Sequence, residues 1–133
     1  MKKRQPSLTV DGIVTFGNKI LLVRRKNPPF KGTFALPGGF VEYGETVEKA
    51  VIREVLEETG LVTRFGCLAG IYSAPDRDPR GHTVSVVFRL KVIGGKLRAG
   101  DDAVEVGLFL IKNLKNMKLA FDHSKILKDA GLF

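Results

Sequence analysis

Residues 38–61, GGFVEYGETVEKAVIREVLEETGL, constrain the fold of this chain more than any other stretch. The second half of the stretch has the features of an α-helix. Thr46 is a candidate N-cap, Glu48 in the first turn favours the helix dipole, and Gly60 is a candidate C-cap. We therefore predict a helix over Val47–Thr59.

The predicted helix carries glutamates where its apolar face should continue. At about 100° per residue, Val47 and Val51 begin an apolar face, and further along the helix Glu54, Glu57 and Glu58 occupy it. Because crowded carboxylates repel one another, this arrangement costs stability unless cations neutralise the charge. A solvated acidic patch on a surface helix is the alternative interpretation.

A second apolar strip, Ile52 and Leu56, lies roughly opposite, so we expect the helix to contact protein on two sides. Its glutamates then cannot all turn to bulk solvent. Mg²⁺ and Mn²⁺ prefer oxygen ligands, and Mg²⁺ shares its coordination sphere between one or two carboxylates, waters and substrate phosphates. The pattern therefore favours a divalent metal site and a phosphate-bearing substrate.

Two further features flank the predicted helix. Gly38 and Gly39 let the backbone come close to a ligand or metal. Arg53 and Glu45 are predicted to form a bidentate ion pair that fixes the preceding loop against the helix, with a solvent-exposed salt bridge as the alternative.

The rest of the chain is rich in β-strand patterns. Strands are predicted at residues 8–16, 19–25, 35–39, 61–74, 83–93 and 104–111, and a closing helix capped by Asp122 at residues 121–132. Residues 17–18 predict a hairpin turn, whereas 26–34, 75–82 and 94–103 are loops. The fold class is α+β, a mixed sheet covered by helices, in a single domain over 1–133.

The composition of the chain limits where the protein is expected to be located and which partners it is expected to bind. The net charge of +8 favours anionic partners, although a Lys-rich surface that serves solubility explains it equally well. No apolar run approaches the length of a membrane span, so we expect a cytoplasmic protein with no membrane partner. Cys67 is the one cysteine, and its apolar surroundings predict buried packing and not a nucleophile.

The helix and its flanks resemble the signature of the Nudix hydrolases, G-x5-E-x7-R-E-U-x-E-E-x-G-U, with U an aliphatic residue. Every constrained position is filled, by Gly39, Glu45, Arg53, Glu54, Val55, Glu57, Glu58, Gly60 and Leu61. The resemblance implies the Nudix fold, a mixed β-sheet sandwiched between α-helices, and hydrolysis of a nucleoside diphosphate linked to another group, dependent on Mg²⁺ (or Mn²⁺). Catalytic candidates are Arg53, Glu57, Glu58 and Glu105.

Roles at the metal follow from the same motif positions. Glu54, Glu57 and Glu58 are the implied metal ligands, with the Gly39 carbonyl as a further one. Bound metal neutralises charge on the pyrophosphate and lowers the pKa of a bound water, and a carboxylate takes the proton. Glu105 is the first choice among later acids, ahead of Asp101 and Asp102, and a turn capped by aspartates is the alternative.

The loop after the 61–74 strand is similar to the ADP-ribose pyrophosphatase branch of the family, in which Pro75 is the associated downstream proline. That likeness implies cleavage of ADP-ribose to AMP and ribose 5-phosphate. Arg77 and Arg80 can supply forked donors to a pyrophosphate, and Asp76 and Asp78 can bind ribose hydroxyls. Arg25 is a further substrate-binding candidate. A salt-bridged turn that serves structure is the alternative.

The remaining expectations concern specificity and partners. His82 and His123 either touch substrate or make local hydrogen bonds. Phe34 and residues 106–109 depart from the usual pattern of relatives. We expect these departures to reshape the wall on which the base stacks, without changing the metal site. The alternatives are a house-cleaning nucleoside triphosphate pyrophosphatase and a non-catalytic nucleotide- or RNA-binding module. We expect a small-molecule partner, no nucleic acid and, by analogy, a homodimer.

Overall fold

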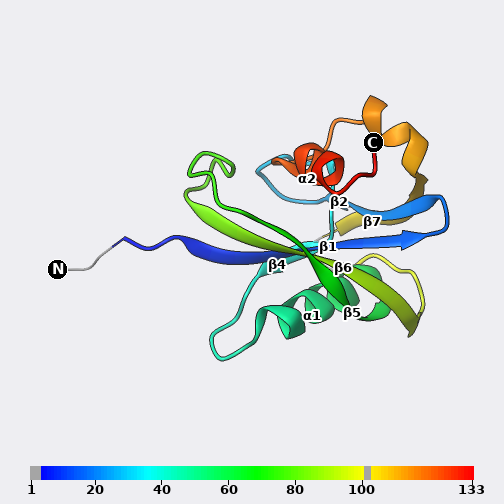
Figure 1. Ribbon diagram of the computed structural model, residues 1–133, viewed down its shortest axis with the longest axis horizontal. Helices are drawn as coiled ribbons and strands as arrows, with labels where there is room; N and C mark the ends of the chain where they lie inside the picture. The colour runs from blue at the N-terminus through cyan, green and yellow to red at the C-terminus, as the bar shows by residue number, and fades with distance from the viewer. Residues whose placement is uncertain (1–3, 101–102) are drawn as a thin grey trace.

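A mixed β-sheet lies between two helices in the computed structural model, which describes residues 4–100 and 103–133 (Figure 1). The predicted α+β class, a mixed sheet covered by helices, is confirmed. In chain order the elements are β1 (Ser7–Phe16), β2 (Lys19–Arg25), β3 (Phe34–Ala35), β4 (Gly38–Phe40), α1 (Val47–Thr59), β5 (Leu61–Tyr72), β6 (Thr83–Gly95), β7 (Ala103–Leu110), the 3₁₀ helix η1 (Ile111–Asn116) and α2 (His123–Asp129).

The sheet splits at its centre. Its strand order is β3-β2-β1-β6-β5, with β4 added beside β1 and β7 beside β2. β1 and β2 pair at Thr15↔Ile20 and Phe16↔Lys19, next to their turn, and then separate. Nearer its start β1 pairs with β4 and runs parallel to β6, whereas β2 pairs with β3 and β7. The separation leaves room for a site between the two halves.

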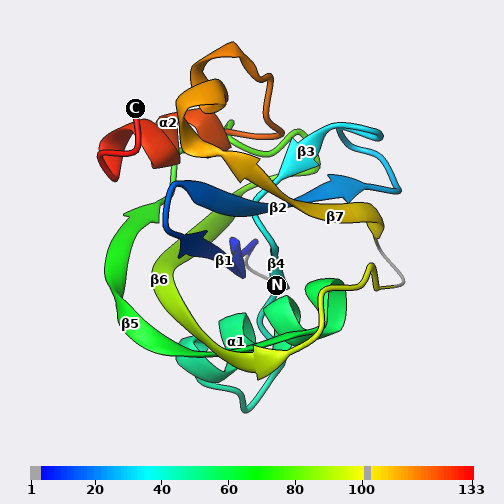
Figure 2. The same cartoon turned by 90° about the vertical axis from the view of Figure 1, so that its right-hand side faces the viewer.

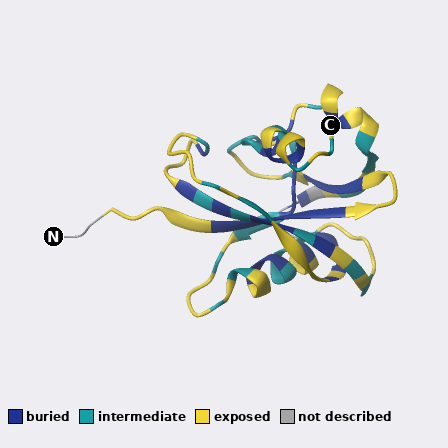
Figure 3. Cartoon of the chain, viewed as in Figure 1, coloured by how far each residue is buried: buried dark blue, intermediate teal, exposed yellow. Residues whose placement is uncertain are grey.

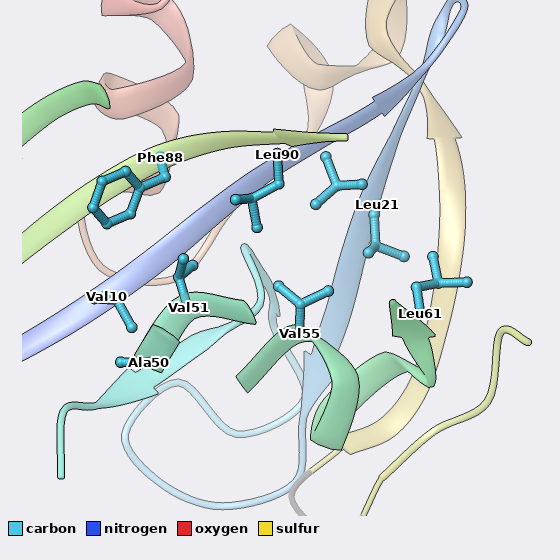
Figure 4. Close-up of a cluster of buried hydrophobic side chains, with 9 residues drawn as sticks. Val10, Leu21, Ala50, Val51, Val55, Leu61, Phe88 and Leu90 are labelled. Atoms are coloured by element: carbon cyan, nitrogen blue, oxygen red, sulfur yellow. The ribbon is translucent and has the colours of Figure 1, made fainter. Parts of the chain in front are cut away.

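The two larger of the three buried apolar clusters among the described residues lie on opposite faces of the sheet, because successive side chains of a strand point to opposite faces. Val10, Leu21 and Phe88 face α1, in the cluster of Figure 4. Ile13 and Leu22 face α2 and η1 on the other side. Figure 2 shows α1 and α2 on these two sides, and Figure 3 shows how the middle of β1 is buried between them.

Helix α1 has the bounds and caps that the sequence predicts. The Thr46 side chain accepts a hydrogen bond from the Lys49 amide at 3.2 Å, and Gly60 ends the helix with φ of 78°. Its buried residues are Ala50, Val51, Val55 and Thr59. The prediction of contact on two sides is wrong for Leu56, which is 40% exposed.

Several other boundaries differ from the prediction. The predicted strand 35–39 is two short strands, because the chain turns at Leu36 and Pro37 to leave β3 and join β1 through β4. The final helix covers His123–Asp129 only, and η1 was not predicted. Asp122 precedes α2 but makes no side-chain cap hydrogen bond.

Strand β5 lies at the edge of the sheet and is largely exposed. Cys67 on this strand is exposed, so the prediction of a buried cysteine is wrong. The sheet there has its second face open to solvent, which the apolar sequence around Cys67 does not reveal. Among the described residues, none of the helices has the length and apolar character needed to cross a bilayer.

Candidate functional site

A cavity of about 420 Å³ opens where β1 and β2 separate. It is lined from β1, β2, β4, α1, the loop before β6 and the start of α2, so distant parts of the sequence meet in it. Its charged and titratable lining residues are Asp11, Arg25, Glu42, Glu54, Glu58, Arg77, Asp78, Arg80 and His123.

One wall consists of the glutamates of α1 against the glycines of β4. Glu54 and Glu58 are one helical turn apart and both line the cavity. The Gly38 amide donates to Glu58 Oε2 at 3.3 Å. A Cβ on Gly39 would lie 2.6 Å from the Glu54 carboxyl carbon, so only glycine lets β4 approach this closely.

Arg53 fixes this wall from outside the cavity. Its guanidinium binds both carboxylate oxygens of Glu45, at 2.7 and 2.9 Å, and Glu54 at 2.8 Å. It also donates to the Phe40 carbonyl at 3.2 Å. The predicted bidentate ion pair is thus present and ties β4 to α1. Its hydrogen bonds lower the pKa of Glu45 to about 2, so that carboxylate stays ionised.

Glu57 shares the Arg53 guanidinium with Glu54 but does not line the cavity. Its carboxylate is 58% exposed and accepts from Arg53 at 3.2 Å, and it is not among the residues that line the cavity. Within residues 4–100 and 103–133, no three His, Cys, Asp or Glu side chains are grouped to hold a metal ion. Of the four predicted metal ligands, Gly39, Glu54 and Glu58 line the cavity and Glu57 does not.

The floor of the cavity contains a buried polar network, of which only His123 is a candidate from the sequence. Asp11 Oδ2 accepts from the Ser85 hydroxyl at 2.5 Å, and Asp11 Oδ1 lies 3.6 Å from His123 Nε2. His123 Nδ1 accepts the Leu36 amide hydrogen at 3.0 Å. Burial raises the pKa of Asp11 to about 7 and lowers that of His123 to about 3. The imidazole is thus neutral near pH 7.

This trio cannot act as a nucleophile triad, because the serine bonds to the aspartate and not to the histidine. It instead joins β1, β6, α2 and the segment before β4. The one signal in the sequence was an aspartate inside the β-branched run of residues 8–16.

The loop before β6 contributes two arginines in different settings. Arg77 is 4% exposed and makes a bidentate ion pair with Asp122, at 2.9 and 2.6 Å, and a 2.8 Å bond to Thr83. Although burial opposes it, Asp122 raises the pKa of Arg77. Its donors are therefore engaged within the protein, as the salt-bridged alternative predicts, and Asp122 serves this pair instead of capping α2.

Arg80 is more open to the cavity. Its guanidinium binds the buried Asp78 at 2.8 Å and is 43% exposed. It lies 5.2 Å from the Phe40 ring and 5.6 Å from the Phe121 ring, distances of cation–π contact. Arg25 lies 4.9 Å from the same Phe121 ring. Burial, together with the charge of Arg80, lowers the pKa of Arg25.

Other candidates lie outside the cavity lining. Glu105 on β7 is 54% exposed and 3.6 Å from Arg24. His82 makes a local hydrogen bond with the Ser73 carbonyl at 3.0 Å, in line with the local alternative. Among the described residues, neither it nor Asp76 lines the cavity. Asp101 and Asp102 lie outside the residues that the structure describes.

The two aromatic positions singled out in the sequence belong to the core. The rings of Phe34 and Phe109 meet edge to face at 4.8 Å and pack against the α2-side cluster. The residues that line the cavity are Phe40 and Phe121 instead. The expectation that Phe34 and residues 106–109 bear on a base-stacking wall is therefore wrong for Phe34 and Phe109, because both rings pack toward η1 and α2 and neither lines the cavity.

Comparison with known proteins gives one family and several relatives. A family model described as the NUDIX domain matches residues 6–130. A curated ADP-ribose pyrophosphatase from Methanocaldococcus jannaschii is 64% identical over 124 residues, which are 93% of this chain and 72% of that protein.

Two solved structures are similar over nearly the whole chain. The NUDIX domain of NrtR from Shewanella oneidensis, complexed with ADP ribose, superposes with a TM-score of 0.85 at 28% identity, covering 97% of this chain and 88% of that one. A bifunctional NMN adenylyltransferase/ADP ribose pyrophosphatase from Francisella tularensis, complexed with AMP and Mn ion, superposes at 0.82 and 31% identity. That match covers 96% of this chain and 42% of the larger protein.

Proposed function

This chain belongs to the NUDIX domain family, and from that premise we propose that it is a hydrolase that cleaves the pyrophosphate of ADP-ribose to AMP and ribose 5-phosphate. The observation that carries the proposal is the cavity, in which two helix glutamates face a glycine pair and arginines lie nearby. The identity to an ADP-ribose pyrophosphatase extends over 93% of the chain, loop before β6 included.

The donor set fits a divalent cation, Mg²⁺ or Mn²⁺. Glu54, Glu58 and the Gly39 carbonyl are oxygen donors, and Gly39 leaves the space beside Glu54 that a Cβ would fill. Two carboxylates are enough, because Mg²⁺ completes its coordination with waters and substrate phosphates. When bound, such a cation neutralises charge on the pyrophosphate and lowers the pKa of a water ligand.

The protein's own residues orient the reaction. Arg53 holds Glu54 through a 2.8 Å hydrogen bond and so fixes the carboxylate that faces Gly39. Hydrolysis transfers a water oxygen to phosphorus, breaks one bridging P–O bond and gives the water proton to a carboxylate. Glu58 is our candidate for that carboxylate because it lines the cavity. Roles for Glu57 and Glu105 as metal ligand or base stay predictions.

Arg25 and Arg80 are the candidates for binding the phosphates. Both line the cavity, and the charge of Arg80 disfavours that of Arg25, so an anion bound near both would relieve the repulsion. Asp78 holds Arg80 in place, and Arg77 acts through Asp122 at the start of α2. A homodimer and a cytoplasmic location stay predictions from the sequence.

The test is hydrolysis by the purified full chain of ADP-ribose, NADH, GDP-mannose, diadenosine polyphosphates and 8-oxo-dGTP with Mg²⁺, with products identified by mass. We expect ADP-ribose to be preferred and to give AMP and ribose 5-phosphate. Turnover confined to triphosphates, with release of pyrophosphate, would replace this function with that of a nucleotide house-cleaning enzyme.

A variant pair tests the assignment of the site. Glu58→Gln should lower kcat by at least about 100-fold, because electrostatic terms dominate phosphoryl chemistry. Glu48→Gln, in the exposed first turn of the same helix, is the matched control and should leave kcat unchanged. Equal activity of the two variants would refute the role of Glu58.

A further inference from the structure

Three planar groups lie together in one part of the cavity, and of these only Arg80 has a role proposed above, as a candidate for binding the phosphates. They are the Phe40 ring, the Arg80 guanidinium and the Phe121 ring, and all three line the cavity. The guanidinium lies 5.2 Å from the centre of the Phe40 ring and 5.6 Å from that of Phe121. We call this set the planar cluster.

The guanidinium of the planar cluster is held in place. Asp78, which is 4% exposed, accepts hydrogen bonds from the Arg80 backbone amide at 2.9 Å and from its side chain at 2.8 Å. Moving Arg80 away would leave a buried carboxylate unpaired, which is costly. Arg80 is therefore a fixed flat surface that contacts both rings and is still 43% exposed.

Phe121 reaches the cavity at a cost in backbone conformation. Its φ is 52°, and that of Phe30, whose ring meets it edge to face at 4.9 Å, is 61°. Bulky side chains rarely adopt this left-handed region, and strained residues of this kind persist where the surroundings hold them and cluster at ligand sites.

Core packing does not explain the position of Phe40 either. It is 47% exposed, yet its carbonyl is bonded by Arg53 at 3.2 Å, beside the helix glutamates. An exposed aromatic ring that is anchored next to the acidic wall gains nothing from core packing. It does offer a stacking face one residue from Gly39.

We propose that the planar cluster is the base-binding subsite of the cavity, on which the purine ring of the nucleotide substrate stacks. The inference rests on the proposed function in that the substrate carries a base. Aromatic rings and guanidinium planes both stack on nucleobases, and a fixed cation beside two rings favours an electron-rich purine. The pyrophosphate then lies toward Glu54, Glu58 and Gly39.

The two products of the proposed reaction separate base binding from phosphate binding. AMP carries a base and a phosphate, whereas ribose 5-phosphate carries a phosphate without a base. By calorimetry with the full chain, Phe40→Leu should weaken AMP binding roughly 5- to 150-fold, the range of one base–aromatic stack. The Kd of ribose 5-phosphate should stay within twofold, and Phe121→Leu should act in the same way.

Phe65→Leu is the matched control, because Phe65 on β5 is 48% exposed, as Phe40 is, and does not line the cavity. It should leave both dissociation constants unchanged. Phe121→Tyr keeps a stacking ring and should retain AMP binding if Phe121→Leu loses it through the stack. Circular dichroism of each variant checks that the fold is retained.

The outcomes separate this inference from the proposed function. If the wild-type chain hydrolyses ADP-ribose but Phe40→Leu binds AMP as the wild type does, or loses both products equally, the base subsite is refuted and the function stands. The same holds if the wild type binds no AMP. If AMP binding depends on Phe40 but ADP-ribose is not hydrolysed, the subsite stands and the proposed function fails.

Discussion

Asp11 and His123 hold one proton between them in the folded protein. Burial keeps Asp11 protonated up to about pH 7, against 3.8 without burial, and keeps His123 neutral down to about pH 3, against 6.5. In the unfolded chain between pH 4 and 6.5 the aspartate is ionised and the histidine is protonated, so the pair again binds one proton. The pair therefore contributes almost no pH dependence of stability in this range.

Each side chain by itself has a strong pH dependence of opposite sign. The stability linked to Asp11 is fully present below pH 3.8 and is lost as the pH rises toward 7, because the folded form must ionise a buried carboxyl. The stability linked to His123 is present above pH 6.5 and is lost as the pH falls toward 3, because the folded form must charge a buried imidazole.

Single substitutions should expose these opposite slopes. Relative to wild type, Asp11→Asn should gain free energy of unfolding with rising pH between 4.5 and 6.5, by up to about 1.4 kcal/mol per pH unit. His123→Gln should lose it over the same range. Urea unfolding at three pH values measures both, with wild type as the reference. Parallel curves for all three proteins would contradict the burial-driven pKa shifts.

Helix α1 is the element that local sequence determined best. Its caps and its buried stripe all lie within one continuous segment, so propensity and periodicity suffice to predict it. The ion pair of Arg53 with Glu45 is equally local, eight residues apart. Both predictions are confirmed for this reason.

Elements that depend on distant partners were predicted less well. The division of residues 35–39 into β3 and β4 depends on β1 and β2 separating, which the hairpin turn does not encode. The place of Asp11 in the buried network depends on Ser85 and His123, which are 74 or more residues away along the chain. Asp122 forms an ion pair with Arg77 instead of capping α2. Such pairings cannot be deduced from spacing in one sequence.

Gly60, at the C-terminal end of α1, allows a prediction about stability. Gly60 has φ of 78°, and a Cβ there would lie 2.1 Å from the Lys96 carbonyl oxygen. Gly60→Ala should therefore lower the free energy of unfolding by well over 1 kcal/mol, from backbone strain and from the clash with Lys96, which follows β6. Urea denaturation measures the loss.

Gly17→Ala separates the two contributions. Gly17 has φ of 55°, but a Cβ there meets no atom within 4 Å. This variant should show the strain alone, about 1 kcal/mol. Equal losses in the two variants would mean that the contact of Gly60 with Lys96 adds nothing, and that the loop after β6 yields freely.

The whole molecule has a net charge of +8, and its cavity is proposed to bind a doubly charged pyrophosphate. A positive field raises the rate of encounter with an anion, and salt screens it over about 10 Å at 0.1 M. Short, partly buried contacts, such as the 2.7 Å bond of Arg53 to Glu45, are screened much less.

Salt should therefore lower kcat/KM for ADP-ribose several-fold between 20 and 200 mM KCl while kcat stays nearly constant, at fixed Mg²⁺. The double variant Lys112→Glu, Lys115→Glu changes exposed residues of η1 outside the cavity and takes the net charge from +8 to +4, since each exchange removes one positive charge and adds one negative. Its salt dependence should be weaker with kcat unchanged. An equal salt dependence in both proteins would mean that the basic surface serves solubility and that Arg25 and Arg80 alone attract the substrate.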